Sequence, residues 1–278
     1  MGIAFIAPLV AVNLLVIAGP SAGTVFYSFT DWSGIGDAEF VGGDNYVRLM
    51  QDAEFWQALL HNIQYTLFFL VVPVAMGLLG AFLLAQITRF QSLFRVLFFL
   101  PYLFASVVNA AIWKILLDPE RGIGSFVPLL RDVYFFGDPQ LALPAIAVVD
   151  NWRWWGFVLV LFVTAMQSVD RSLYEAAEMD GASRWQQFWH VTIPGIRPTF
   201  VFVILMTIIG SLLVFDYVYI LTNGGPGGAS EVVATLMYKL AFDRFDAGYA
   251  SAMGLGLSLV VGVVISVFVF LRRRGWEI

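Results

Sequence analysis

Polar side chains interrupt several of the most apolar stretches of this sequence, and aromatic residues stand beside them. Asn109 and Asp216 lie in two such stretches, while Asp150 and Arg153 lie in a third that is rich in tryptophan. Planar hydrogen-bonding groups next to aromatic faces can hold a sugar ring, because the first bind hydroxyls and the second cover C–H surfaces. These four residues are therefore candidates for contact with a small polyhydroxylated ligand.

The composition is typical of a membrane protein. Hydrophobic residues make up 60% of the chain, charged residues make up 13%, and the mean hydropathy is +0.82. Soluble domains have roughly 45–50% apolar and about 25% charged residues. A soluble fold of 278 residues could not bury this much apolar surface. The net charge of −5 consequently says nothing about nucleic acid, which we do not expect as a partner.

Six apolar runs are long enough to cross a bilayer, since a spanning helix needs about 20 apolar residues. The first run lacks the basic leader and cleavage site of a signal peptide, so we expect it to be retained, and the missing cytoplasmic leader indicates a trimmed N-terminus. We predict one all-α integral membrane domain over residues 1–278 with about six transmembrane helices. The runs cover residues 3–27, 58–87, 93–117, 141–168, 199–222 and 248–271.

Arginine is denser in the loops on one side of these predicted helices. That side holds residues 88–92, 169–198 and the tail with Arg272, Arg273 and Arg274, while the other side holds the more acidic loops 28–57, 118–140 and 223–247. By the positive-inside rule the first side is cytoplasmic. Loop 169–198 should therefore lie in the cytoplasm.

Each polar residue of the apolar runs also has a purely structural explanation. Asp150 and Arg153 could form a salt bridge at i,i+3, and Asn109 could bind a neighbouring helix. Trp154 and its neighbours could anchor the fourth helix at the membrane surface. The residue types alone do not decide between packing and ligand contact.

Enzymatic chemistry finds no support in the residues. There is no cysteine and no Gly-x-x-x-x-Gly-Lys-Ser/Thr loop for a nucleotide. The two histidines, His61 and His190, fall on opposite predicted sides of the membrane, which argues against a metal site or a catalytic triad. We therefore expect a protein that is not an enzyme and that binds no cofactor or metal itself.

Loop 169–198 carries the most specific pattern in the chain. Asp170 can cap a short polar helix whose glycine stop is Gly181, and Pro194 ends the amphipathic segment that follows. Such a helix could lie at the membrane surface without any partner. The pattern consists of Glu175-Ala176-Ala177, then Asp180-Gly181, and then Val191-Thr192-Ile193-Pro194.

This pattern resembles the signature loop of the permease subunits of binding-protein-dependent ABC importers. In that family the loop is the coupling helix that docks on a separate ATPase, so the resemblance gives this role to Glu175, Ala176, Ala177, Asp180 and Gly181. The chain departs from the usual Ile-x-Leu-Pro only at Val191 and Ile193, and both residues are conservative in shape. Further segments resemble the carbohydrate-uptake branch, which includes maltose and glycerol-3-phosphate permeases: Leu100-Pro101-Tyr102, Asp150-Asn151-Trp152-Arg153-Trp154, Leu221 to Pro226, and Ala241 to Ala252.

The resemblance implies an inner-membrane subunit that moves a sugar or sugar derivative by alternating access. Its implied partners are a second homologous permease, a dimer of ATPase subunits that hold ATP and magnesium, and an extracytoplasmic binding protein. It also implies that Asp150, Trp154, Phe157 and the surroundings of Ser211 and Val214 line the pathway. Asn109 and Asp216 rest on the physical argument alone, and Arg153 is a further candidate of the fourth span. The substrate stays open among oligosaccharides, monosaccharides, polyols and anionic sugars held by Arg153.

Two other classes of protein compete with this interpretation. A secondary, ion-coupled transporter would normally show inverted repeats and interrupted helices around an ion site, and it would need no docking loop. A membrane-embedded enzyme would need a catalytic cluster, which the sequence does not offer.

Overall fold

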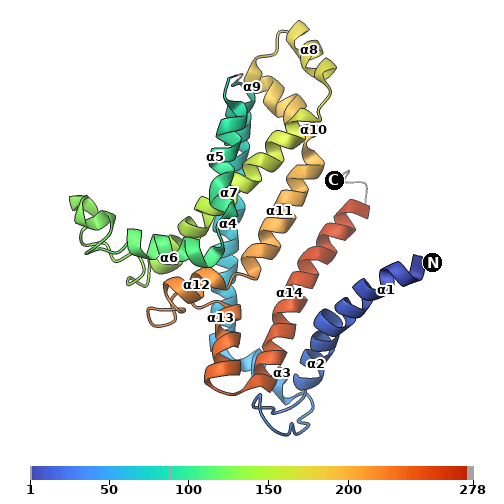
Figure 1. The fold of residues 1–278 in the computed structure, drawn as a ribbon, viewed down its shortest axis with the longest axis vertical. Helices are drawn as coiled ribbons and strands as arrows, with labels where there is room; N and C mark the ends of the chain where they lie inside the picture. Colours follow the sequence, from blue (N-terminus) through green and yellow to red (C-terminus); the bar gives the residue numbers. More distant parts are fainter. Residues whose placement is uncertain (1, 88, 274–278) are drawn as a thin grey trace. The chain divides into compact units, whose positions relative to one another are not determined.

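The computed structural model describes residues 2–87 and 89–273, and these residues are almost entirely helical (Figure 1). Within them the only extended pairing is an isolated bridge between Thr30 and Phe40. The chain separates into two compact units, each described here by itself. Unit 1 comprises Met1–Leu60 and Glu231–Val263, and unit 2 comprises His61–Ser230 and Val264–Ile278.

Unit 1 is built around a helix corner near residue 52. An apolar cluster joins Leu49 and Phe55, on either side of this corner, to Leu236, Tyr249 and Met253. The helical elements of the unit are α1 (Gly2–Asn13), η1 (Leu14–Ala18), α2 (Gly19–Tyr27), α3 (Asp44–Gln51), the start of α4 (Ala53–Ala85), α13 (Val233–Tyr238), η5 (Lys239–Asp243) and most of α14 (Ala247–Arg273).

Unit 2 is organised around α7 (Ala142–Gln167), whose residues Val158, Leu159 and Phe162 are fully buried. The rest of α4 and the other helices of the unit surround it. These are α5 (Gln91–Leu103), α6 (Ser106–Leu116), η2 (Ile123–Ser125), η3 (Pro128–Leu130), α8 (Arg171–Met179), α9 (Arg184–Gln187), η4 (Phe188–Thr192), α10 (Ile193–Gly195), α11 (Arg197–Leu212) and α12 (Asp216–Leu221).

Glycines allow two helices to approach α7 closely. A Cβ added at Gly156 of α7 would lie 1.9 Å from the backbone oxygen of Phe98 in α5. A Cβ at Gly77 or Gly80 of α4 would lie 2.6 Å from a side-chain carbon of α7. Small residues at such contacts let the helix backbones meet, which is how helices associate where lipid offers no hydrophobic driving force.

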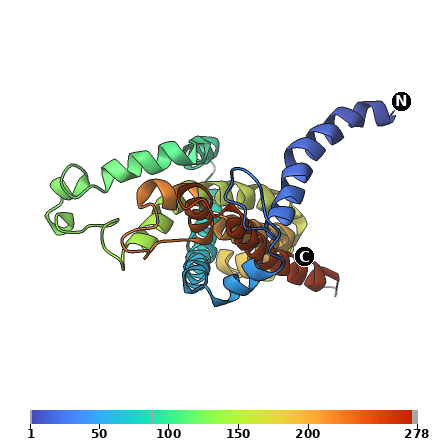
Figure 2. The same ribbon diagram turned by 90° about the horizontal axis from the view of Figure 1, so that it is seen from below.

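The predicted spans agree with the helices in four places and differ in two. Four helices are long and apolar enough to cross a membrane, or up to six if two bent pairs each count as one span. The predicted third span, 93–117, is not one helix, because α5 and α6 meet at 93° (Figures 1 and 2). Pro101 supplies no backbone N–H near the end of α5, and Phe104 and Ala105 are extended.

The predicted fifth span, 199–222, also breaks. Helix α11 ends at Leu212, whose carbonyl oxygen accepts a hydrogen bond of 3.0 Å from the side chain of Asn62, and α12 begins only at Asp216. Asp216 therefore starts a short helix instead of lying within a long one. Of the predicted cytoplasmic arginines of the tail, Arg274 lies outside the described residues.

We expect Gly156→Ala to lower the thermal stability of the purified protein. The new methyl group would meet the Phe98 carbonyl, which is backbone and cannot rotate away, and overpacking of this kind costs about 1–3 kcal/mol. Gly210→Ala is the matched control, since a Cβ there meets nothing within 4 Å. Unfolding temperatures in detergent should fall for the first variant only; equal temperatures would contradict the close contact of α5 and α7.

Candidate functional site

A cluster of polar side chains joins four helices of unit 2. Tyr65 of α4 donates a hydrogen bond of 2.8 Å to Oδ2 of Asp150 in α7, and both side chains are buried. Arg153 lies one helical turn beyond Asp150, with its Nε 3.8 Å from Oδ1 of that carboxylate. The salt bridge expected from the i,i+3 spacing is therefore present, and it is held in place by a tyrosine from another helix.

Two aromatic rings flank the guanidinium of Arg153. Its central carbon lies 5.4 Å from the ring centroid of Tyr102 and 5.8 Å from that of Tyr217, within the range of a cation–π attraction. Asn109 of α6 fixes the second ring, because its amide donates to the Tyr217 hydroxyl at 2.9 Å and to the Val149 carbonyl at 3.5 Å. The cluster thus connects α6, α7 and α12.

Four buried polar atoms of this region make no hydrogen bond. Three are acceptors, namely Oδ1 of Asn109, Asp150 and Asn151, and one is a donor, Nε of Arg153. Buried polar atoms are normally paired, and an unpaired one costs about 1–3 kcal/mol. Oδ1 of Asp150 and Nε of Arg153 face each other in the salt bridge, so the amide oxygens of Asn109 and Asn151 are the acceptors open to a further donor.

An aromatic surface continues from this cluster along α7. The rings of Tyr102 and Phe157 are stacked with centroids 4.6 Å apart, and Trp154 lies 5.2 Å from Phe157. Trp154 is held by a hydrogen bond of 3.2 Å from its Nε1 to the Thr207 hydroxyl of α11. Trp152, on another side of the helix, packs edge-on against Trp113.

Two of the sequence-predicted residues have other partners. Ser211 donates a hydrogen bond to Thr66 of α4 at 2.8 Å, and Asp216 accepts one from Ser106 at the α5–α6 corner. The structure thus brings together Asn109, Asp150 and Arg153, with Trp154 and Phe157 beside them. Ser211 and Asp216 sit at separate contacts between helices.

The sequence analysis missed Tyr65, the residue that orients Asp150. The available signal was a polar stripe on α4, where Asn62, Tyr65 and Thr66 recur at helical spacing within an otherwise apolar run. Each binds another helix of the unit: Asn62 binds the end of α11, Tyr65 binds Asp150, and Thr66 is bound by Ser211.

The polar helix α8 begins and ends as its sequence predicts. The Asp170 carboxylate caps it by accepting from the Ser172 N–H at 2.9 Å, an interaction that also lowers the pKa of that carboxyl. Gly181 has a φ of +76°, and its N–H bonds the Glu178 carbonyl while that of Ala182 bonds the Ala177 carbonyl. This pair of bonds is a Schellman motif, in which glycine avoids the strain of the left-handed backbone.

Helix α8 is exposed but is anchored firmly at its base. Tyr174 binds Thr192 through their hydroxyls at 2.9 Å, and Gln187 donates to the Ala182 carbonyl at 3.1 Å. Behind it, Arg184 binds Gln86 of α4, and Phe188 is buried. Glu175 pairs only with Arg171 of its own helix, at 3.1 Å, and both side chains are largely exposed. Most side chains of α8 are therefore exposed, and Figure 1 shows the helix at one end of unit 2, next to α9.

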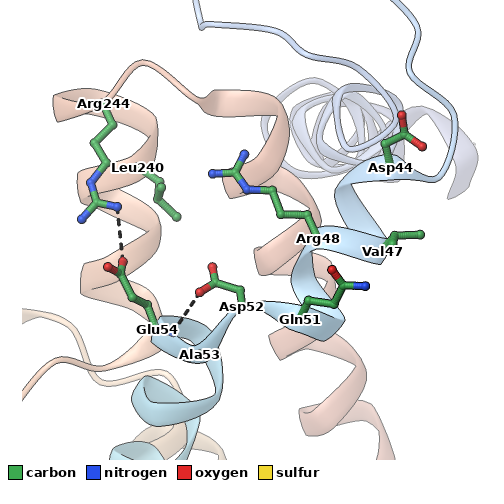
Figure 3. A pocket seen from close by; sticks show the side chains of 9 residues that line it. All are labelled: Asp44, Val47, Arg48, Gln51, Asp52, Ala53, Glu54, Leu240 and Arg244. Atoms are coloured by element: carbon green, nitrogen blue, oxygen red, sulfur yellow. Dashed lines mark hydrogen bonds and ion pairs between the residues drawn. The ribbon is translucent and has the colours of Figure 1, made fainter.

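A separate charged pocket lies in unit 1 (Figure 3). Its volume is 590 Å³, and its lining comes from the α3–α4 corner and from η5 with Arg244. Arg244 pairs with Glu54 at 3.3 Å, Arg48 pairs with Asp246 at 2.7 Å, and Asp52 caps α4 by accepting from the Glu54 N–H. The pocket thus joins residues of two loops, 28–57 and 223–247, that the sequence places on the same side of the membrane.

Comparison with known proteins gives consistent results. Residues 74–274, more than half of the chain, match the family model described as "Binding-protein-dependent transport system inner membrane component". A probable ABC transporter permease of Bacillus subtilis is 35% identical over 265 residues, covering 92% of this chain and 90% of that protein. A lactose transport system permease of Rhizobium radiobacter is 30% identical over 279 residues, covering 96% and 91%.

Solved structures match over nearly the whole chain as well. A chain of a bacterial ABC transporter that imports the acidic polysaccharide alginate has a TM-score of 0.86 at 24% identity, covering 98% of this chain and 95% of its own. At that identity the likeness concerns the fold.

Proposed function

The chain belongs to the family of binding-protein-dependent transport system inner membrane components, and we propose that the substrate it carries is a sugar or sugar derivative. The chain is thus a multi-pass membrane subunit of a transport system, and not an enzyme. Family membership also decides against an ion-coupled secondary transporter. The observation that carries the proposal is the cluster of buried Asp150 and Asn109 with the partly buried Arg153, beside the aromatic surface of Trp154.

The relatives support the same class of substrate. Lactose is the substrate named for the Rhizobium radiobacter relative, and trehalose and maltose are named for a permease of Thermococcus litoralis that is 29% identical over 259 residues. The site offers what a sugar needs, namely planar hydrogen-bonding groups and aromatic faces within one unit.

We assign the link to ATP hydrolysis to α8. ATP and magnesium are bound by a separate ATPase subunit, and the polar outer face of α8, with Glu175, Ala176 and Asp180 exposed, docks on it. Ala177 faces the pocket behind the helix, next to Gly181 and Gln187. The rigid anchoring of α8 at Tyr174 supports this assignment, because a movement of the ATPase can then be passed to the spans.

A second permease subunit completes the pathway, most simply as a heterodimer with a homologue. The four to six spans of one chain are too few to enclose a sugar. Polar groups are also costly where they face lipid. Asp150 is buried within unit 2, whereas Asp216 is exposed and Trp154 is half-buried. The last two are therefore the residues most accessible from a neighbouring subunit.

We also infer that an extracytoplasmic binding protein delivers the substrate on the side of the membrane that the sequence predicts to be outside. Each unit offers one candidate contact for it: the charged pocket in unit 1, and loop 118–140, which exposes Phe126 and Leu129, in unit 2. Carboxylates such as Asp44 and Glu54 stay in water there and can be paired from outside.

Removal of the Trp154 ring should slow uptake. In proteoliposomes with the complete importer, Trp154→Ala should reduce uptake of labelled lactose or maltose roughly two- to tenfold, because one aromatic contact is worth about 0.5–1.5 kcal/mol. Trp154→Phe keeps an aromatic face and should lose less. The control is Trp152→Ala, which alters a ring packed on Trp113. Equal losses in the two alanine variants would show that the effect is one of packing.

Substitution of Gly181, the glycine that ends α8, should uncouple ATP hydrolysis from transport. Gly181→Leu places a branched residue in the left-handed region, at a cost of about 1–2 kcal/mol, although its Cβ would meet no atom within 4 Å of this chain. Coupled ATP hydrolysis and co-purification of the ATPase should fall, while Gly181→Asn, which tolerates this conformation, should retain both. Gly228→Leu carries the same strain at a φ of +84° and should leave ATPase association unchanged. Normal coupling in Gly181→Leu would argue against the assignment of α8.

Photocrosslinking can test both assigned docking surfaces, namely α8 for the ATPase and loop 118–140 for the binding protein. Met179 of α8 is 89% exposed and Leu129 of loop 118–140 is 86% exposed, so a photoreactive residue at either position would point into solvent. Met179 should capture the ATPase, and Leu129 should capture the binding protein. The reverse result would overturn the orientation of the chain.

A further inference from the structure

We propose that the substrate is uncharged where it meets the Asp150–Arg153 pair: the guanidinium compensates the carboxylate within the protein and is not a receptor for an anionic sugar. This inference rests on the proposed function, because it takes the cluster to be part of the pathway. The proposal favours neutral saccharides and polyols over sugar acids and sugar phosphates as substrates. The residue types alone do not decide between these two classes.

The first support is that Arg153 already has partners within the protein. Its Nε lies 3.8 Å from the Asp150 carboxylate, and the rings of Tyr102 and Tyr217 lie within 6 Å of its central carbon. A carboxylate or phosphate that approached the guanidinium would have to compete with Asp150, a like charge at the same place. Moreover, a single buried charge left without its counter-ion is strongly unfavourable.

The second support is the balance of unpaired atoms. Of the buried atoms without a hydrogen bond, Oδ1 of Asp150 and Nε of Arg153 face each other at 3.8 Å, which leaves two acceptors, Oδ1 of Asn109 and of Asn151, and no further donor. Sugar hydroxyls can donate to such acceptors, whereas the oxygens of a carboxylate or phosphate cannot donate. An anionic group would thus bring further acceptors to a place that already has too many.

The third support is the way the pair is held. Tyr65 directs its hydroxyl to Oδ2 of Asp150, which leaves Oδ1 on the side of Arg153 without a hydrogen bond. The Asn109 amide is likewise turned so that both of its contacts, to Tyr217 and to the Val149 carbonyl, use the nitrogen. The orientation of the amide keeps an acceptor available, which suits a ligand rich in hydroxyl groups.

Matched sugars and a charge-neutral variant test the proposal. The probes are lactose and maltose, and the acids lactobionate and maltobionate, in which the reducing end is a carboxylate. Uptake is measured with the complete importer in proteoliposomes. The variants are Asp150→Asn, Arg153→Gln and the double variant, with thermal stability and co-purification of the ATPase as checks on folding and assembly.

Wild type should take up a neutral sugar at least about tenfold faster than its acid, a difference of 1.4 kcal/mol or more. Each single variant should lose about tenfold or more, because it leaves one buried charge alone. The double variant should lose less than either single variant, because no charge is then left without its counter-ion, whereas the loss that remains measures the contacts of the two side chains with the sugar.

The opposite results are equally definite. Faster uptake of the acids, or a loss in Arg153→Gln that Asp150→Asn does not repair, would show that Arg153 binds an anion and would overturn the proposal while leaving the pathway in place. Unchanged uptake in all three variants would instead remove the cluster from the pathway, and so refute the proposed function of these residues. If the importer takes up none of the four probes, this result would count against a neutral sugar as its substrate.

Discussion

Every polar side chain inside the apolar helices has to find its partner within the protein, because lipid offers none. In unit 2 many of these partners come from another helix, and several of the contacts meet on α7. Tyr65 reaches Asp150 from α4, Asn109 reaches the Val149 carbonyl from α6, and Trp154 reaches Thr207 on α11. The polar cluster is therefore both a candidate site and a large part of what fixes the helices relative to α7.

These contacts require the helix backbones to be close, and glycine provides that closeness. Gly156 admits the Phe98 carbonyl of α5, which brings Tyr102, one turn further on, next to Arg153 and Phe157. A helix kept away by a side chain at position 156 could not place that ring as a cover for the guanidinium. Packing and chemistry thus depend on the same residue, although Gly156 touches no polar group of the cluster.

The structure could be predicted from the sequence wherever a local rule determines it. The cap at Asp170, the left-handed stop at Gly181 and the apolar helices follow from residue type and spacing. The 93° corner between α5 and α6 was missed, because its residues are as apolar as a continuous span and Pro101 is tolerated in many membrane helices. Tyr65 was missed for a related reason: its role depends on which helix lies opposite, and one sequence does not contain that information. Asp150 and Arg153 were found because charge in an apolar run is conspicuous.

The connection between α8 and the polar cluster consists of short, identifiable steps. Tyr174 of α8 binds Thr192, which lies just before the 72° bend at Ile196. Helix α11 starts at that bend, and its 16 residues would extend about 24 Å. It binds Trp154 through Thr207, and its Ser211 binds Thr66. Helix α11 thus contacts the aromatic surface through Thr207 and contacts α4 through Ser211. A shift of α8 that tilts α11 would therefore pull on the Trp154 side chain, or break its hydrogen bond to Thr207. Either outcome changes the shape of the site where we place the sugar, and it needs no other moving element.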